Sequence, residues 1–117
     1  MRAKYVDWMA IGWLLVVTWM SLAPLPELPE IREGDKLGHI AAYALLAGLA
    51  TLHRQRYLAV IAIAAAIVAY GGLIELVQPL VNRHGEFGDF VANGAGVLLG
   101  IGTVVSLSRL TAWLRAR

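Results

Sequence analysis

Four long apolar stretches, separated by short polar segments, dominate the chain. They are Val6–Ala23, Leu37–Leu52, Leu58–Leu80 and Phe90–Leu107. A helix needs about 20 residues to cross ~30 Å of hydrocarbon, and the second stretch reaches that length only if its helix starts earlier, at Asp35. The pattern therefore predicts an all-α fold with membrane helices at about 6–23, 35–52, 58–80 and 89–108.

Composition supports a membrane class. Hydrophobic residues make up 59% of the 117 residues and charged residues only 15%, which is far from an ordinary soluble domain. A chain of this length has no room for a second domain, so residues 1–117 are predicted to form one transmembrane four-helix bundle. The chain has no cysteine, which excludes disulfides and Cys-ligated metals.

The charges are divided between the two predicted sides of the membrane. One side carries seven basic residues and Asp7, a net charge of +6, and the other side, counting Glu75, carries three basic and seven acidic residues. The seven basic residues are Arg2, Lys4, Arg54, Arg56, Arg109, Arg115 and Arg117. Because short basic loops stay cytoplasmic, we expect an N-in/C-in, multi-pass protein of the cytoplasmic (inner) membrane. The net charge of +2 thus reflects topology and does not indicate nucleic-acid binding.

A second interpretation treats residues 1–23 as a cleaved signal peptide. Arg2 and Lys4 would form its basic region, and Ser21-Leu22-Ala23 its small-residue cleavage site. Pro24 directly after that site disfavours processing, and the Pro-rich run 24–29 is typical of a stiff extended loop between helices. A retained first membrane helix is the preferred interpretation.

Glycines are concentrated in the fourth stretch, at positions 94, 96, 100 and 102. Gly96 and Gly100 form a G-x-x-x-G motif, which lets another helix approach closely. A dinucleotide-binding fingerprint is excluded because position 99 is Leu within a membrane span. We therefore interpret all four as packing glycines, which could also allow a homo-oligomer through this helix. Gly71-Gly72 would provide a facing smooth surface or a local bend.

Polar residues gather at the predicted outer end of three spans. Helical spacing puts Asp35, His39 and Tyr43 on one stripe of the second helix, with Lys36 beside it. Glu75 lies inside the third span. A carboxylate in hydrocarbon costs roughly 2.5–3.5 kcal/mol, so Glu75 is predicted to point into the bundle. The remaining candidates are Gln78 on the third helix, Arg83 in the following loop, and Asp89 and Asn93 at the start of the fourth helix.

Each of these residues also has a purely structural interpretation. Asp89 could cap the fourth helix, Asn93 could hydrogen-bond between helices, and His39 could donate to a carbonyl or to Glu75. Basic side chains at an interface usually extend toward lipid headgroups. A shared functional site is favoured because three helices bring polar groups to the same level.

The order of these motifs resembles the VanZ-like membrane protein family. The motifs are D-K-x-x-H-x-x-x-Y at 35–43, E-x-x-Q at 75–78, Arg83, and D-x-x-x-N-x-x-G at 89–96, and the likeness covers residues 30–102. The resemblance implies a link to low-level resistance to the glycopeptide antibiotic teicoplanin. It also implies a family site made of Asp35, Lys36, His39, Glu75, Gln78, Arg83, Asp89 and Asn93. The loop between Arg83 and Asp89, which carries Gly85-Glu86-Phe87-Gly88, departs from the family's pattern.

Two functions follow from this predicted site. In the first, the protein binds an amphiphilic or anionic envelope ligand at the outer leaflet, such as a lipopeptide-like antibiotic, a lipid headgroup or a lipid-linked cell-wall precursor. Lys36 and Arg83 would contact its anionic group. In the second, an intramembrane enzyme acts on a lipid or isoprenoid carrier, with His39 or Glu75 as general acid or base. Binding is favoured because no nucleophile with a positioned base is evident.

A metal site is a third possibility for the same cluster. It would be built from His39, Asp35, Glu75, His84 and Asp89. Their spacing matches no known metal-binding pattern. We therefore predict neither a metal nor a cofactor.

Overall fold

The structure, a computed structural model, describes residues 2–23, 32–81 and 87–117, and for residues 32–35 it describes the backbone alone. Within these ranges all regular secondary structure is helical, as predicted. The helices are α1 (Ala3–Leu22), α2 (Arg32–Thr51), α3 (Tyr57–Val77), the short 3-10 helix η1 (Gln78–Val81) and α4 (Phe87–Arg115). The predicted Pro-rich loop at 24–29 and Arg83 lie outside the described residues.

Helix boundaries follow the prolines and differ from the predicted ones mainly in length. Ala23 is extended after α1, as expected for a residue that precedes proline. Pro79 cannot donate a backbone hydrogen bond, and the α-helical pattern of α3 gives way to η1 there. The fourth helix runs to Arg115 and not to 108, because the polar segment after Leu107 contains no helix-breaking residue.

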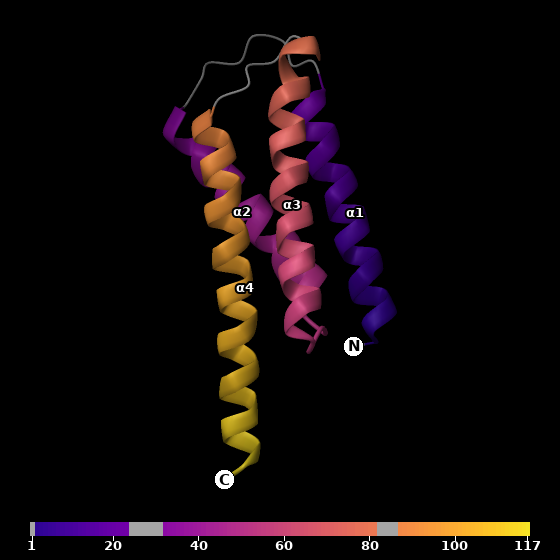
Figure 1. Cartoon of the computed structure of the whole chain (residues 1–117), viewed down its shortest axis with the longest axis vertical. Coiled ribbons are helices and arrows are strands. Elements are labelled where there is room, and N and C mark those ends of the chain that lie inside the picture. Colours follow the sequence, from indigo (N-terminus) through magenta and orange to yellow (C-terminus); the bar gives the residue numbers. More distant parts are fainter. Residues whose placement is uncertain (1, 24–31, 82–86) are drawn as a thin grey trace.

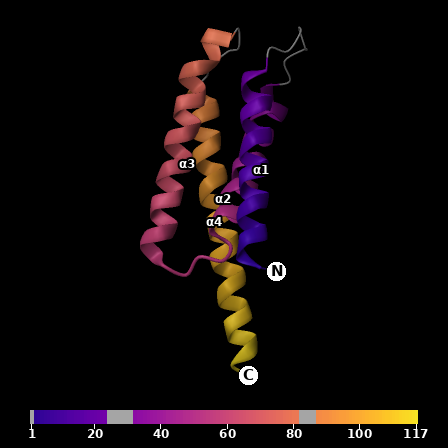
Figure 2. The same cartoon turned by 90° about the vertical axis from the view of Figure 1, so that its right-hand side faces the viewer.

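The four helices alternate in direction, so the chain ends and the turn at 52–56 lie at one end of the bundle (Figure 1). We call this the basic end, because all seven basic residues of the predicted cytoplasmic side belong to it. At 1.5 Å per residue, α4 is about 43 Å long. Its last turns project beyond the other helices at the basic end (Figure 2).

Helix α2 lies at the centre of the bundle and contacts α1, α3 and α4. Its closest contact is with α4, at the predicted G-x-x-x-G motif. A Cβ at Gly96 would lie 2.5 Å from the Ile40 carbonyl oxygen, and one at Gly100 would overlap the Ala44 carbonyl group. The packing interpretation of these two glycines is therefore confirmed.

The other glycines divide between packed and open positions. Nothing lies within 4 Å of a Cβ placed at Gly94 or Gly102, so the packing interpretation was wrong for these two within this chain. A homo-oligomer through α4 remains a prediction and would have to use that open surface. Gly71 faces Tyr43 and Asn93, and Gly72 faces the Phe90 ring. Both provide the smooth surface predicted for α3.

The hydrophobic core joins all four helices around Tyr43, Ala47 and Val97. Helix α1 is fixed to α2 by the Trp13 indole, whose Nε1–H donates to the Ala42 carbonyl oxygen at 2.9 Å. Near the other end of α1, the Thr18 and Tyr70 hydroxyls are hydrogen-bonded to each other. These contacts set the position of α1 against α2 and α3.

Three helical segments are long and apolar enough to cross a membrane: Ala3–Leu22, Tyr57–Val81 and Phe87–Arg115. They leave many large apolar side chains exposed, among them Leu15, Leu58 and Leu98. Contiguous exposed apolar surface of this kind is unusual in a soluble monomer and normal against lipid. Helix α2 does not meet the same criteria among the described residues, although it is the most enclosed of the four.

Candidate functional site

Four predicted site residues meet where α2 packs against the start of α4, at the end opposite the basic end. His39 donates from Nδ1 to Oδ1 of Asn93 at 2.8 Å, and its Nε2 lies 3.7 Å from Oδ2 of Asp89. Lys36 Nζ lies 3.6 Å from Oδ1 of Asp89. We call Lys36, His39, Asp89 and Asn93 the seam cluster.

The seam cluster runs from the surface into the bundle. The Lys36 side chain is 42% exposed, His39 17% and Asp89 only 6%, and Asn93 is buried. A buried carboxylate is costly unless cations or donors surround it. Lys36 and His39 supply those neighbours, and the first turn of α4, where Asp89 lies, adds the favourable end of the helix dipole. The structural interpretation of Asp89 as a helix cap is therefore modified. Asp89 lies inside the first turn of α4, which begins at Phe87, and not at the position before the helix.

Three further predicted site residues, Tyr43, Glu75 and Gln78, have buried polar atoms. A Cβ at Gly71 would lie 3.4 Å from the Tyr43 hydroxyl and 3.1 Å from Asn93 Nδ2, so these two groups share one side of α3. Glu75 Oε1 is buried, as predicted. Gln78 is buried and donates to the Ser21 carbonyl oxygen at 3.2 Å.

Several buried polar atoms in this region make no hydrogen bond within the described part of the chain. They are the Tyr43 hydroxyl, Gln78 Oε1 and Asp89 Oδ1. Buried polar atoms are nearly always hydrogen-bonded, to protein or to ordered water. This concentration of unused hydrogen-bonding capacity distinguishes the region from ordinary interhelical packing.

The structure does not test every predicted site residue. Arg83 and His84 lie outside the described residues, and for Asp35 the backbone alone is described, in the first turn of α2. Among the described residues, no group of three His, Cys, Asp or Glu side chains is arranged to hold a metal ion. The described contacts of the seam cluster are one hydrogen bond and two charge pairs.

A second polar cluster lies at the basic end, and the sequence interpretation did not foresee it. Asp7 Oδ1 accepts from His53 Nε2 at 2.8 Å and from an Arg54 terminal nitrogen at 3.2 Å. Arg54 Nε also donates to the Ala50 carbonyl oxygen at 2.9 Å. We call Asp7, His53 and Arg54 the basic-end cluster. Its sequence signal was a lone acid within an otherwise basic side.

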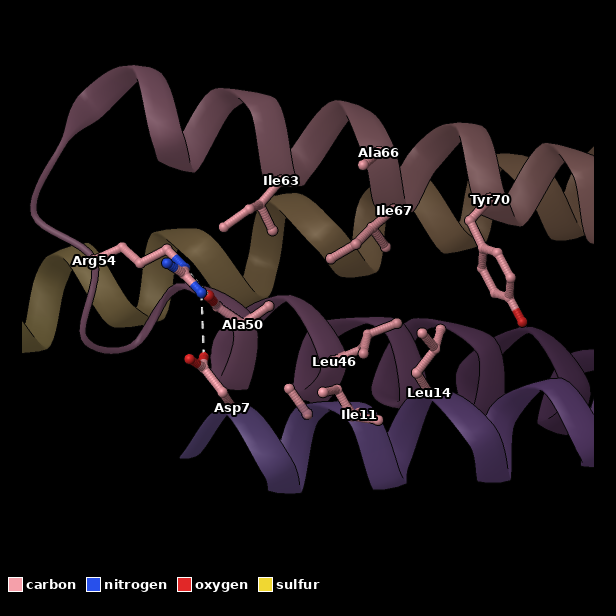
Figure 3. Close-up of a pocket in the computed structure, with 11 residues that line it drawn as sticks. Asp7, Ile11, Leu14, Leu46, Ala50, Arg54, Ile63, Ala66, Ile67 and Tyr70 are labelled. Atoms are coloured by element: carbon pink, nitrogen blue, oxygen red, sulfur yellow. Dashed lines mark hydrogen bonds and ion pairs between the residues drawn. The ribbon is translucent and has the colours of Figure 1, made fainter. Parts of the chain in front are cut away.

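The basic-end cluster borders an open-sided pocket of about 450 Å³ between α1, α2 and α3. In Figure 3 the Asp7–Arg54 pair lies at one end of the pocket and Tyr70 at the other. The wall between them is apolar and is formed by Ala10, Ile11, Leu14, Leu46, Ala50, Ile63, Ala66 and Ile67. Apolar helix faces of this type are indistinguishable from lipid-facing surface in the sequence.

Comparisons with known proteins leave these two regions as the basis for any functional conclusion. No protein-family model matches the chain, and neither a curated protein nor a solved structure is significantly similar to it.

Proposed function

We propose that this chain is a four-pass inner-membrane protein with both termini in the cytoplasm. Three apolar helices and the collection of seven basic residues at one end support this orientation. Helix α2 is less apolar than the others, but it needs less apolar surface because its neighbours cover much of it. Its polar start would then lie at the outer interface, where charged side chains are tolerated.

Labelling of single cysteines tests this orientation, because the natural chain has none. Gln55→Cys lies in the turn at the basic end and Leu80→Cys at the opposite end, and both positions are exposed. The reagent is a maleimide that passes the outer envelope but does not cross the inner membrane. In intact cells it should label Leu80→Cys only. Gln55→Cys should react after the inner membrane is opened. Labelling in the reverse order would contradict the proposed topology.

Within that topology, we propose that the seam cluster and its polar surroundings bind an amphiphilic or anionic envelope ligand at the outer leaflet. The observation that carries this is a buried carboxylate, Asp89, next to a partly buried imidazole and a half-exposed ammonium group between two closely packed helices. Ionisable groups inside a membrane domain are expensive and usually serve a function. The half-exposed Lys36 would contact the anionic group, and His39 and Tyr43 would orient it.

The motif resemblance to VanZ-like proteins suggests teicoplanin, or the lipid-linked cell-wall precursors near which it acts, as ligands to test first. Binding is favoured over catalysis because of the side chains that His39 contacts. These are Asp89 and Asn93, and neither carries a hydroxyl or a thiol. Acyl transfer usually requires such a nucleophile next to a base. Arg83 stays a predicted ligand contact.

The test is a comparison of variants at matched abundance. Purified protein in lipid nanodiscs would be titrated with teicoplanin, and cells overproducing each variant would be scored for teicoplanin tolerance. Lys36→Gln, at a half-exposed position, should weaken both readouts without changing membrane abundance. Arg109→Gln, on the exposed end of α4, is the control and should change neither. If Lys36→Gln and His39→Gln both bind and protect like the natural chain, the seam cluster is not the ligand site.

A further inference from the structure

The pocket beside the basic-end cluster has the form of a binding site for a lipid chain. Three alanines, one from each helix, create its width: Ala10 on α1, Ala50 on α2 and Ala66 on α3. Larger side chains at these positions would fill the space between α1 and α3. Helices α1 and α3 are joined by the Thr18–Tyr70 hydrogen bond and diverge from there toward the basic end (Figure 2).

The pocket also has the length for part of an acyl chain. It extends from Asp7 to Leu14 along α1 and from Ile63 to Tyr70 along α3, which corresponds to about 10 Å at 1.5 Å per residue. One leaflet of a ~30 Å hydrocarbon core is about 15 Å deep. A chain entering at the basic end would therefore be enclosed over about two thirds of its leaflet.

Charge at the pocket mouth specifies the headgroup. A guanidinium has five N–H donors, and the two described hydrogen bonds of Arg54, to Asp7 and Ala50, use only two of them. The Arg54 side chain is 35% exposed. Arg56 follows in the same turn, and Arg2 and Lys4 precede Asp7 at the same end. Arg54 and Asp7 are the charged residues that line the pocket, and the three further bases make the surrounding basic end positive, which favours a phosphate group near Arg54.

We infer that the α1–α2–α3 pocket binds one anionic phospholipid, with its phosphate at Arg54 and the first part of one acyl chain between α1 and α3. The inference rests on the proposed membrane location, but it does not depend on the seam cluster or its ligand. The Asp7 carboxylate holds the guanidinium at the mouth, so Asp7 is a positioning residue. A second copy of this chain is a less suitable occupant, because the basic mouth would repel an identical one.

Native mass spectrometry of the full chain in detergent tests the inference. Phosphatidylglycerol and phosphatidylcholine with identical acyl chains would be added separately. The natural chain should retain one phosphatidylglycerol and far less phosphatidylcholine. Because hydrogen bonds to charged groups are strong, Arg54→Gln should weaken phosphatidylglycerol binding roughly tenfold. Arg109→Gln, which removes an exposed cation from α4, is the matched control and should have no effect.

Two alanine variants test the acyl-chain part separately. Ala66→Trp fills the pocket and should abolish retention of the lipid, whereas Ala65→Trp, at an exposed neighbouring position outside the pocket lining, should retain it. Equal lipid binding by these two variants would overturn the inference. So would equal retention of the two lipids, or a dimer of the chain that Ala66→Trp disrupts. Failure of the lipid-binding tests would not affect the expectation that ligand binding at the seam cluster depends on Lys36. The two proposals can therefore fail independently.

Discussion

The seam cluster and the basic-end cluster contain similar groups, since each combines a carboxylate, a histidine and a basic side chain, yet the bundle encloses them differently. In the seam cluster Asp89 is 6% exposed and lies between two closely packed helices. In the basic-end cluster Asp7 is 40% exposed and borders an open pocket. The same chemistry is therefore part of the core at one end and part of the surface at the other.

This difference shows how packing determines what a polar cluster contributes. Removing one partner of a buried charge pair typically costs about 3–5 kcal/mol, because the remaining charge is no longer compensated. Exposed pairs contribute little, since water and salt replace the lost partner. We thus expect the buried Asp89 and Asn93 of the seam cluster to be coupled to folding. The half-exposed Lys36 and the basic-end cluster can contact a ligand with a smaller effect on stability.

The largest effect should come from separating the helices that enclose the seam cluster. Gly100→Leu places a side chain where the Ala44 carbonyl group lies. Overpacking costs typically about 1–3 kcal/mol, and we expect the upper end or more here because the obstacle is backbone. Membrane abundance and monodispersity in detergent should fall sharply. Gly102→Leu, which faces open space, should behave like the natural chain, and equal losses in both variants would contradict the α2–α4 contact.

A smaller effect is expected from breaking a hydrogen bond within the seam cluster. Asn93→Leu keeps the size of the side chain but leaves His39 Nδ1 without its acceptor, so the free energy of unfolding should fall by about 1–3 kcal/mol. The measurement is denaturant unfolding in detergent. Combining it with His39→Leu should recover part of the loss, because two apolar partners leave no unsatisfied group. A purely additive double variant would mean that the two residues are not coupled.

Loss of the bond that fixes α1 to the bundle should matter less. Trp13→Phe keeps an aromatic ring but removes the Nε1–H donor to Ala42, so we expect a decrease of about 0.5–1.5 kcal/mol. Trp19→Phe, at a 70% exposed position, is the control for changing a tryptophan on the same helix. Thermal unfolding of both variants would rank them. A larger decrease for Trp19→Phe would show that lipid or detergent contact, and not this bond, holds α1.

The smallest effect on folding should come from the basic-end cluster. Asp7→Asn keeps an acceptor for His53 and Arg54 while removing the charge, and Asp7 is exposed. We therefore expect an unchanged unfolding midpoint, in contrast to Asp89→Asn, which should lower it. Unfolding of the two variants in the same detergent compares the clusters directly. A larger decrease for Asp7→Asn would reverse the distinction between core and surface cluster drawn above.

The apolar stretches and the spacing of polar residues were sufficient to predict four helices and the convergence of Lys36, His39, Asp89 and Asn93 at one end. Alternating helices of similar length must return polar ends to the same level, so motif order alone brings these residues together. The inward position of Glu75 and the close approach at Gly96 and Gly100 were predictable for the same kind of reason. A charge avoids lipid, and paired glycines permit contact.

Tertiary structure decided what the sequence pattern left ambiguous. Helices α1 and α3 carry apolar side chains on nearly all their faces. The sequence pattern therefore does not distinguish their lipid-facing sides from the sides that line the pocket with Ile11, Ile63 and Ile67. Glycine spacing likewise did not reveal that Gly94 and Gly102 face open space while Gly96 and Gly100 contact α2. Asp7 lies 46 residues before His53 and 47 before Arg54 in the sequence. Only the approach of α1 to the turn after α2 brings them together. In a bundle that is apolar on nearly every face, sequence determines that helices form and which prolines interrupt them, whereas side-chain packing between helices determines which face meets which.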